Sequence, residues 1–165
     1  MTEKPLINKV AQKAIIQIDP VSFLPKATDI VAFDMKDFLF KGLLLKEKDF
    51  RAQLKAFDFS VLENKYVYIF CSTQAIIPMW ANMLLAAYLN PICSQVVFAE
   101  TLFAAEELFL LQELENLDIE KYTNKRVVIK GCGDKDFSPL VYVYIMRILQ
   151  PVAKAVSFGE ACSMV

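Results

Sequence analysis

Three of the four cysteines stand at or just after segments that have the composition of buried β-strands. Cys71 ends the segment YVYIFC, Cys132 follows RVVIKG, and Cys162 follows AVSFGEA. Two carboxylates, Glu100 and Asp134, occupy similar places after strand-like segments. Thiolates and carboxylates bind zinc, and thiolates also hold iron–sulfur clusters. These five side chains are therefore our candidate metal ligands.

The chain contains no histidine. This excludes a Ser-His-Asp triad, a Cys-His pair and an HExxH zinc site. No other side chain changes its charge near neutral pH unless its surroundings shift its pKa. Any chemistry must therefore use thiolates, carboxylates, lysine, tyrosine or a bound metal.

Two other interpretations of the thiols stay open. One cysteine could be the nucleophile of a thiol-dependent enzyme, in which Lys130, two residues before Cys132, would stabilise the thiolate. Alternatively, the cysteines could only fill the core as small hydrophobic residues, in a non-catalytic binding or scaffold module. Cys93 precedes a strand-like segment instead of following one, and we assign it to the core.

Strand and helix patterns alternate along the chain. β-branched and aromatic runs predict strands at 14–19, 30–35, 66–71, 95–100, 126–132 and 155–158. Apolar periodicity, prolines and capping residues predict helices at 78–89, 102–118 and 138–152, and a helical stretch between 36 and 58 that Gly42 divides. We find no internal repeat.

This alternation predicts an α/β fold, a three-layer sandwich around a mostly parallel sheet, with residues 1–165 as a single domain. The first two strands could add an antiparallel edge. Parallel strands joined by crossovers point the same way, so the carboxyl ends of the last four strands should share one edge, where open α/β sheets bind ligands. The five candidate ligands would meet at that edge.

The composition of the chain argues against two classes of partner, nucleic acids and membranes. The net charge is −1 and there is no run of Lys or Arg, which argues against nucleic-acid binding. The most apolar stretch, 76–89, contains a proline and is too short to cross a membrane. The first residues lack the apolar core of a signal peptide, so we expect a cytoplasmic protein with reduced thiols.

The hydrophobic fraction is 56%, which is high for a small monomer. The predicted helix at 102–117 has an apolar arc wider than one sheet face requires. We therefore expect a homo-oligomer, with a dimer favoured, that associates through this helix.

The segments CSTQAIIPMWANMLLA, VVIKGCGD and PVAKAVSFGEACS together resemble a bacterial family known only as a domain of unknown function, the one numbered 2480. The resemblance covers nearly the whole chain and carries no assigned chemistry. Family members often have proline where this chain has Ala161. Their genes often lie beside iron–sulfur assembly genes, so the resemblance implies metal or cluster handling, with iron–sulfur assembly proteins as partners.

These observations lead to one functional hypothesis. We expect an accessory protein that binds zinc, iron or an iron–sulfur cluster through Cys71, Cys132 and Cys162, with Glu100 or Asp134 as a further ligand.

Overall fold

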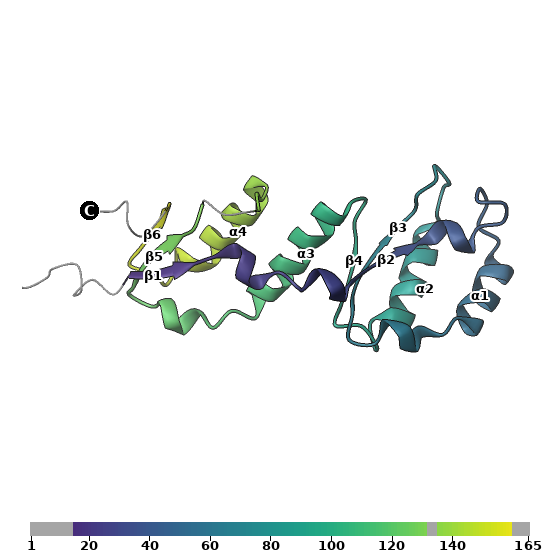
Figure 1. Ribbon diagram of the computed structural model, residues 1–165, viewed down its shortest axis with the longest axis horizontal. Helices are drawn as coiled ribbons and strands as arrows, with labels where there is room; N and C mark the ends of the chain where they lie inside the picture. Colours follow the sequence, from purple (N-terminus) through teal and green to yellow (C-terminus); the bar gives the residue numbers. More distant parts are fainter. Residues whose placement is uncertain (1–14, 132–134, 160–165) are drawn as a thin grey trace, which may run out of the picture. The chain divides into compact units, whose positions relative to one another are not determined.

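The computed structural model describes residues 15–131 and 135–159, which form two three-stranded sheets (Figure 1). One sheet has the order β1-β5-β6, from β1 (Ile15–Ile18), β5 (Arg126–Ile129) and β6 (Ala155–Phe158). The other has the order β2-β3-β4, from β2 (Ile30–Asp34), β3 (Tyr66–Phe70) and β4 (Gln95–Phe98). The predicted α/β class with mostly parallel sheets is confirmed.

Two details differ from the sequence analysis. The strands divide between two sheets, so the carboxyl ends of the last four strands do not share one edge. Both N-terminal strands are edge strands, but β1 pairs with β5 and β2 with β3 in parallel. Alternation of strands and helices predicts strand direction, whereas the identity of neighbouring strands depends on contacts that are distant in sequence.

The described residues form two compact units. One comprises Leu24–Leu110, which we call the inner unit; the other, the outer unit, comprises the described residues before Leu24 and after Leu110. The boundary falls within α3 (Leu102–Glu115). In the described part of the chain, no helix has the length and apolar character needed to cross a membrane.

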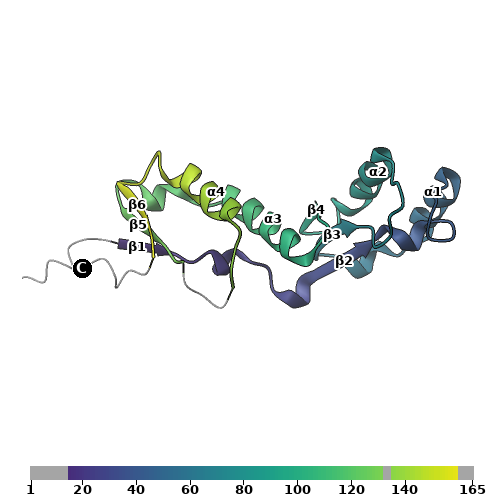
Figure 2. The ribbon, with the colours of Figure 1, turned by 90° about the horizontal axis from the view of Figure 1, so that it is seen from above.

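The inner unit has three layers. Val67 and Ile69 of β3 point to one face, where they join Phe50 of α1 (Glu47–Ala56) and Leu85 of α2 (Met79–Leu89) in one buried cluster. Figure 2 shows α1 and α2 on the same side of this sheet. Successive side chains of a strand point to opposite faces of the sheet, so alternate apolar residues of β3 cover each of its two faces.

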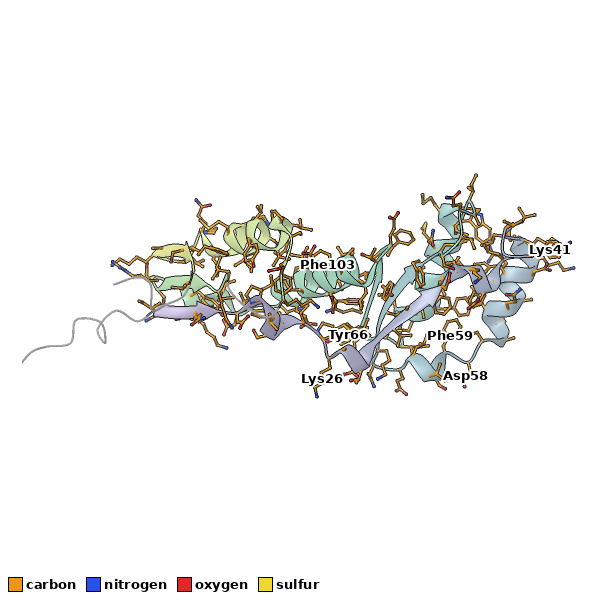
Figure 3. All side chains as sticks on the ribbon, turned by 45° about the horizontal axis from the view of Figure 1, so that its top comes forward. Lys26, Lys41, Asp58, Phe59, Tyr66 and Phe103 are labelled. Carbon is orange, nitrogen blue, oxygen red and sulfur yellow. The ribbon has the colours of Figure 1, made fainter. Side chains whose placement is uncertain are left out.

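The opposite face of this sheet packs on α3. Tyr66 and Tyr68, which alternate with the valine and isoleucine of β3, contact a cluster that contains Ala105 and Phe109. The rings of Tyr66, labelled in Figure 3, and Phe109 lie 5.4 Å apart, edge to face. Because Phe109 is fully buried within the unit, part of the wide apolar arc of α3 serves the sheet of its own chain.

The outer unit packs α4 (Pro139–Leu149) on the β1-β5-β6 sheet. Its helix buries Val141, Ile145 and Leu149 at the spacing of one helical face. Ser138 and Pro139 occupy the N-cap and first helical positions, as the sequence predicts.

The two units repeat the same order of elements at a spacing of sixty residues. The sequence analysis found no internal repeat, and this expectation was wrong. α2 and α4 start and end sixty positions apart, and so do β4 and β6. The 3-10 helices Phe59–Leu62 and Ile119–Tyr122 keep the same spacing. At this spacing NKYVYIF aligns with NKRVVIK, and NPICSQVVFAE with QPVAKAVSFGE.

The backbone geometry repeats with the sequence. Asn64 and Asn124 both adopt positive φ, at 58° and 57°, a conformation that asparagine tolerates better than most residues. The Asn64 N–H donates to the Ile92 carbonyl at 3.0 Å, and the Asn124 N–H donates to the Val152 carbonyl at 2.9 Å. The chain therefore contains two copies of a strand–helix–strand motif, each introduced by a 3-10 helix.

The edge strands β1 and β2 repeat as well, at a spacing of fifteen residues. An aspartate stands at the carboxyl end of each strand, directly after β1 and as the last residue of β2. It accepts a hydrogen bond from the second residue after it: Asp19 from Val21 N–H at 3.1 Å, and Asp34 from Lys36 N–H at 2.9 Å. A 3-10 helix follows each of them. Each sheet is thus built from one repeated edge strand and one repeated motif.

Candidate functional site

A cavity of about 390 Å³ lies at the carboxyl-terminal edge of the β2-β3-β4 sheet. Its polar lining comes from Cys71 after β3, Glu100 after β4 and Asn82 of α2. Its apolar lining consists of Met35, Ala75, Ile77, Met79 and Phe98. The cavity therefore brings together a thiol, a carboxylate and an amide at the edge where α/β sheets bind ligands.

The segment that carries Cys71 is tied to the neighbouring strand. The Ser72 N–H donates to Asp34 Oδ1 at 3.0 Å, which connects the end of β3 to the end of β2. The Cys71 Sγ and Thr73 Oγ1 lie 3.3 Å apart, within hydrogen-bond distance for sulfur. These contacts hold the segment that follows Cys71 beside the end of β2.

The Asp34 carboxylate accepts hydrogen bonds from the backbone N–H groups of Lys36 and Ser72. Partial burial raises the pKa of its carboxyl, but hydrogen bonds from the Ser72 side chain and from the backbone N–H groups of Lys36 and Ser72 outweigh burial. The pKa of Asp34 is therefore lowered from its ordinary value. A carboxylate that accepts several N–H groups is stabilised in its charged form.

We expect Asp34→Asn to lower the free energy of unfolding at neutral pH by about 1 kcal/mol, because two backbone donors lose a charged acceptor. The contribution of a carboxylate with a lowered pKa is present above the unfolded pKa of 3.8 and is lost as pH falls through the folded pKa. Urea denaturation of both proteins should thus converge below about pH 4. Asp37→Asn, an exposed neighbour, is the control; a pH-independent difference would contradict the assignment.

Asn82 is the site residue that the sequence analysis missed. Its Oδ1 atom is buried and accepts no hydrogen bond from the described residues. A buried acceptor without a donor costs free energy, so such groups occur where a water, ion or ligand supplies the partner. The sequence contained one indication of this residue: Asn82 is the one strongly polar side chain within the apolar helix MWANMLLAAYL.

The outer unit carries different residues at the counterparts of three positions that line the cavity. Sixty residues on, the counterparts of Cys71, Asn82 and Phe98 are Gly131, Tyr142 and Phe158. The Phe158 ring lies against Gly131, where a Cβ would collide with it, and it packs edge to face on Tyr142 with ring centroids 5.2 Å apart. At these positions the outer unit packs an aromatic pair, whereas the inner unit places Cys71 and Asn82 beside a cavity.

The predicted ligands divide into two groups. Cys71 and Glu100 line the same cavity. Cys132, Asp134 and Cys162 lie outside the described residues. Within the described ranges, no three side chains among Cys, Asp, Glu and His form a group that could hold a metal ion.

Cys93 contributes to the core, as its position before a strand suggested. Its side chain packs against the buried cluster of the inner unit. Burial raises the pKa of the Cys93 thiol, which keeps it protonated at neutral pH. It is therefore a suitable control for experiments on the other cysteines.

Lys130, which could have stabilised a thiolate, is engaged elsewhere. Its Nζ donates to Asp19 Oδ2 at 2.8 Å, across the ends of β5 and β1. This hydrogen bond is the largest cause of the lowered pKa of Asp19. No lysine or arginine lines the Cys71 cavity in the described part of the chain.

The fold and the cavity define an α/β protein with parallel sheets and a cavity at the carboxyl-terminal edge of one of them. The chain belongs to the family described as "Protein of unknown function (DUF2480)", whose model matches residues 4–165. Neither the curated proteins nor the solved structures gave a match to this chain.

Proposed function

We propose that this protein binds a transition-metal ion, zinc or iron, or an iron–sulfur cluster, and serves as a cytoplasmic accessory protein in metal or cluster metabolism. The observation that carries the proposal is the shared cavity of Cys71 and Glu100 at the carboxyl-terminal edge of a parallel sheet. Both are ligand types that zinc accepts.

The donor set supports a metal better than a nucleophilic thiol. A catalytic thiolate requires a nearby cation or helix N-terminus to lower its pKa. The charged group that lines the Cys71 cavity in the described residues is a carboxylate, Glu100, and not a cation. A bound metal cation would be attracted to both the thiolate and the carboxylate.

Further ligands must complete a tetrahedral site. The buried Oδ1 of Asn82 lines the same cavity and lacks a donor, so it is available as an oxygen ligand. Cys132, Asp134 and Cys162 remain the other proposed ligands, and iron–sulfur assembly proteins remain the proposed partners. Cys132 and Cys162 follow β5 and β6, which are neighbours in the other sheet.

The test is the metal content of untagged protein purified without oxygen. We expect about one equivalent of zinc or iron per chain by elemental analysis, and at least a tenfold loss of metal affinity in Cys71→Ser. Glu100→Gln should weaken binding less, because an amide oxygen remains. Cys93→Ser, the control at a thiol outside the cavity, should keep the metal.

Two outcomes would reject the proposal. One is wild-type protein with less than about a tenth of an equivalent of zinc and iron, even after reconstitution. The other is equal metal loss in Cys71→Ser and Cys93→Ser, since that result would indicate a general effect of losing a thiol. Separate Cys132→Ser and Cys162→Ser variants show whether those thiols belong to the same site.

A further inference from the structure

A tight hairpin stands between β2 and α1 of the inner unit. Phe40 and Leu44 form an isolated antiparallel bridge, in which the Phe40 N–H donates to the Leu44 carbonyl at 2.8 Å. Between them Lys41, labelled in Figure 3, and Gly42 adopt positive φ, at 52° and 69°. Two successive residues in this region reverse the chain sharply, as in a type I′ turn. We call residues 40–44 the apolar hairpin.

The large side chains of the apolar hairpin are exposed. Leu43 is 72% exposed, Leu44 58% and Phe40 44%. The chain on both sides is anchored, because Leu39 is buried and Leu45 packs against the buried cluster of the inner unit. Turns in water are normally polar, and a group of exposed apolar residues usually marks a binding surface. The hairpin is thus held by its own unit while its apolar side chains stay outside.

Positive charge surrounds this apolar surface. Four exposed lysines lie within it or close to it in sequence: Lys36, Lys41, Lys46 and Lys48. None of the four forms an ion pair with a carboxylate in the part of the chain that the structure describes. The Nζ atoms of Lys46 and Lys41 lie 3.4 Å and 5.5 Å from the centroid of the Phe40 ring. The ammonium groups therefore directly border the apolar side chains.

The excess of positive charge is local. Residues 36–48 carry four lysines against two carboxylates, Asp37 and Glu47, whereas the whole chain has a net charge of −1. Glu47 is also paired with the Arg51 Nε at 2.9 Å. An apolar tip with unpaired lysines around it is complementary to an anionic bilayer, which offers phosphates above an apolar layer.

We propose that the apolar hairpin docks this protein on the surface of a bilayer that contains anionic lipids. Leu43 and Leu44 enter the boundary between head groups and acyl chains, and the lysines extend to the phosphates. The sequence analysis argued only against a segment that crosses a membrane. A hairpin that rests in the surface requires no such segment.

The size of the hairpin favours a bilayer over a protein partner. At about 150 Å² or more for a large apolar side chain, the exposed parts of Phe40, Leu43 and Leu44 amount to roughly 300 Å². A stable protein complex buries about 800 Å² per partner. Within the described residues, no residue of the hairpin lines the Cys71 cavity, so the docking does not depend on a bound metal.

Flotation of the full chain with lipid vesicles on a density gradient tests the proposal. The wild type should float with vesicles of phosphatidylcholine and phosphatidylglycerol in equal amounts, and bind at least about tenfold more weakly to phosphatidylcholine alone. Leu43→Glu should weaken binding to the anionic vesicles at least about tenfold, and so should Lys41→Gln combined with Lys46→Gln. Val61→Glu, which adds the same charge at a 64% exposed position of the inner unit, should bind like the wild type.

Three results would overturn this assignment: a wild type that does not float, equal binding to both kinds of vesicle, or equal losses in Leu43→Glu and Val61→Glu. Circular dichroism of each variant confirms that it is folded, and Leu43→Ser repeats the test without an added charge. Cys71→Ser should float like the wild type, which separates this proposal from the metal site.

Discussion

Replacing Phe109 by alanine should lower the free energy of unfolding by about 3–5 kcal/mol, the usual cost of deleting a fully buried aromatic side chain. Phe109 is 0% exposed and packs with Ala105 of α3 against Tyr66 of β3. Its loss leaves a cavity between the helix and the sheet, so the whole third layer of the inner unit should loosen. Urea denaturation followed by circular dichroism measures the change.

Phe103→Ala on the same helix is the matched control. Phe103, labelled in Figure 3, is 45% exposed, so its removal deletes fewer buried contacts and should cost less than about 1 kcal/mol. The sequence analysis assigned this helix to a subunit interface. If that assignment holds for Phe109, the Phe109→Ala protein would lose association and keep its stability in the monomeric state, and the packing argument would be wrong.

Local patterns predicted the elements of this fold well. Each predicted strand and each of the three later helices is present, because apolar runs, Ser138-Pro139 and Asn90-Pro91 act within a few residues of the chain. Thr101 caps α3 as expected, since its Oγ1 accepts from the Ala104 N–H at 3.2 Å. Helix ends lie up to three residues inside the predicted ones, which is the usual uncertainty of element boundaries.

The grouping of strands could not be predicted in the same way. β1 is far from β5 in sequence, and the pairing Ile15–Arg126 leaves no local signal. The repeat was missed because few letters match, although polar Asn64 and Asn124 both occupy left-handed backbone positions. Comparing the segments that follow the asparagine–lysine pairs at 64–65 and 124–125 would have shown it.

The sequence predicted two of the three polar residues that line the cavity, Cys71 and Glu100, but not Asn82. Cys71 and Glu100 share a cavity because β3 and β4 are parallel neighbours, which the alternation of elements predicts. Asn82 of α2 lines the same cavity. Which side of α2 faces the strand ends depends on the orientation of the helix, and the sequence does not predict that orientation. The sequence cannot show that the Phe158 ring packs on Tyr142 at the counterpart positions of the outer unit.

The second large effect concerns the two units, which the sequence analysis treated as one domain. Leu85 and Ile145 are repeat counterparts, both 0% exposed, and each packs on its own sheet side. Leu85→Ala and Ile145→Ala should each cost about 2–5 kcal/mol through the cavity that they create. Hydrogen exchange read by mass spectrometry should show loss of protection in β2, β3 and β4 for Leu85→Ala, and in β1, β5 and β6 for Ile145→Ala.

This pattern follows from the two compact units, because cooperative unfolding proceeds through groups of residues that share buried contacts. Asn90→Ala and Gln150→Ala, at exposed counterpart positions after the same helices, should change stability by less than about 0.5 kcal/mol and serve as controls. Equal loss of protection in both sheets for either core variant would show that the chain unfolds as one cooperative domain. The repeat would then be a property of local structure alone, and the metal site and the apolar hairpin would have to be tested as parts of one folding unit.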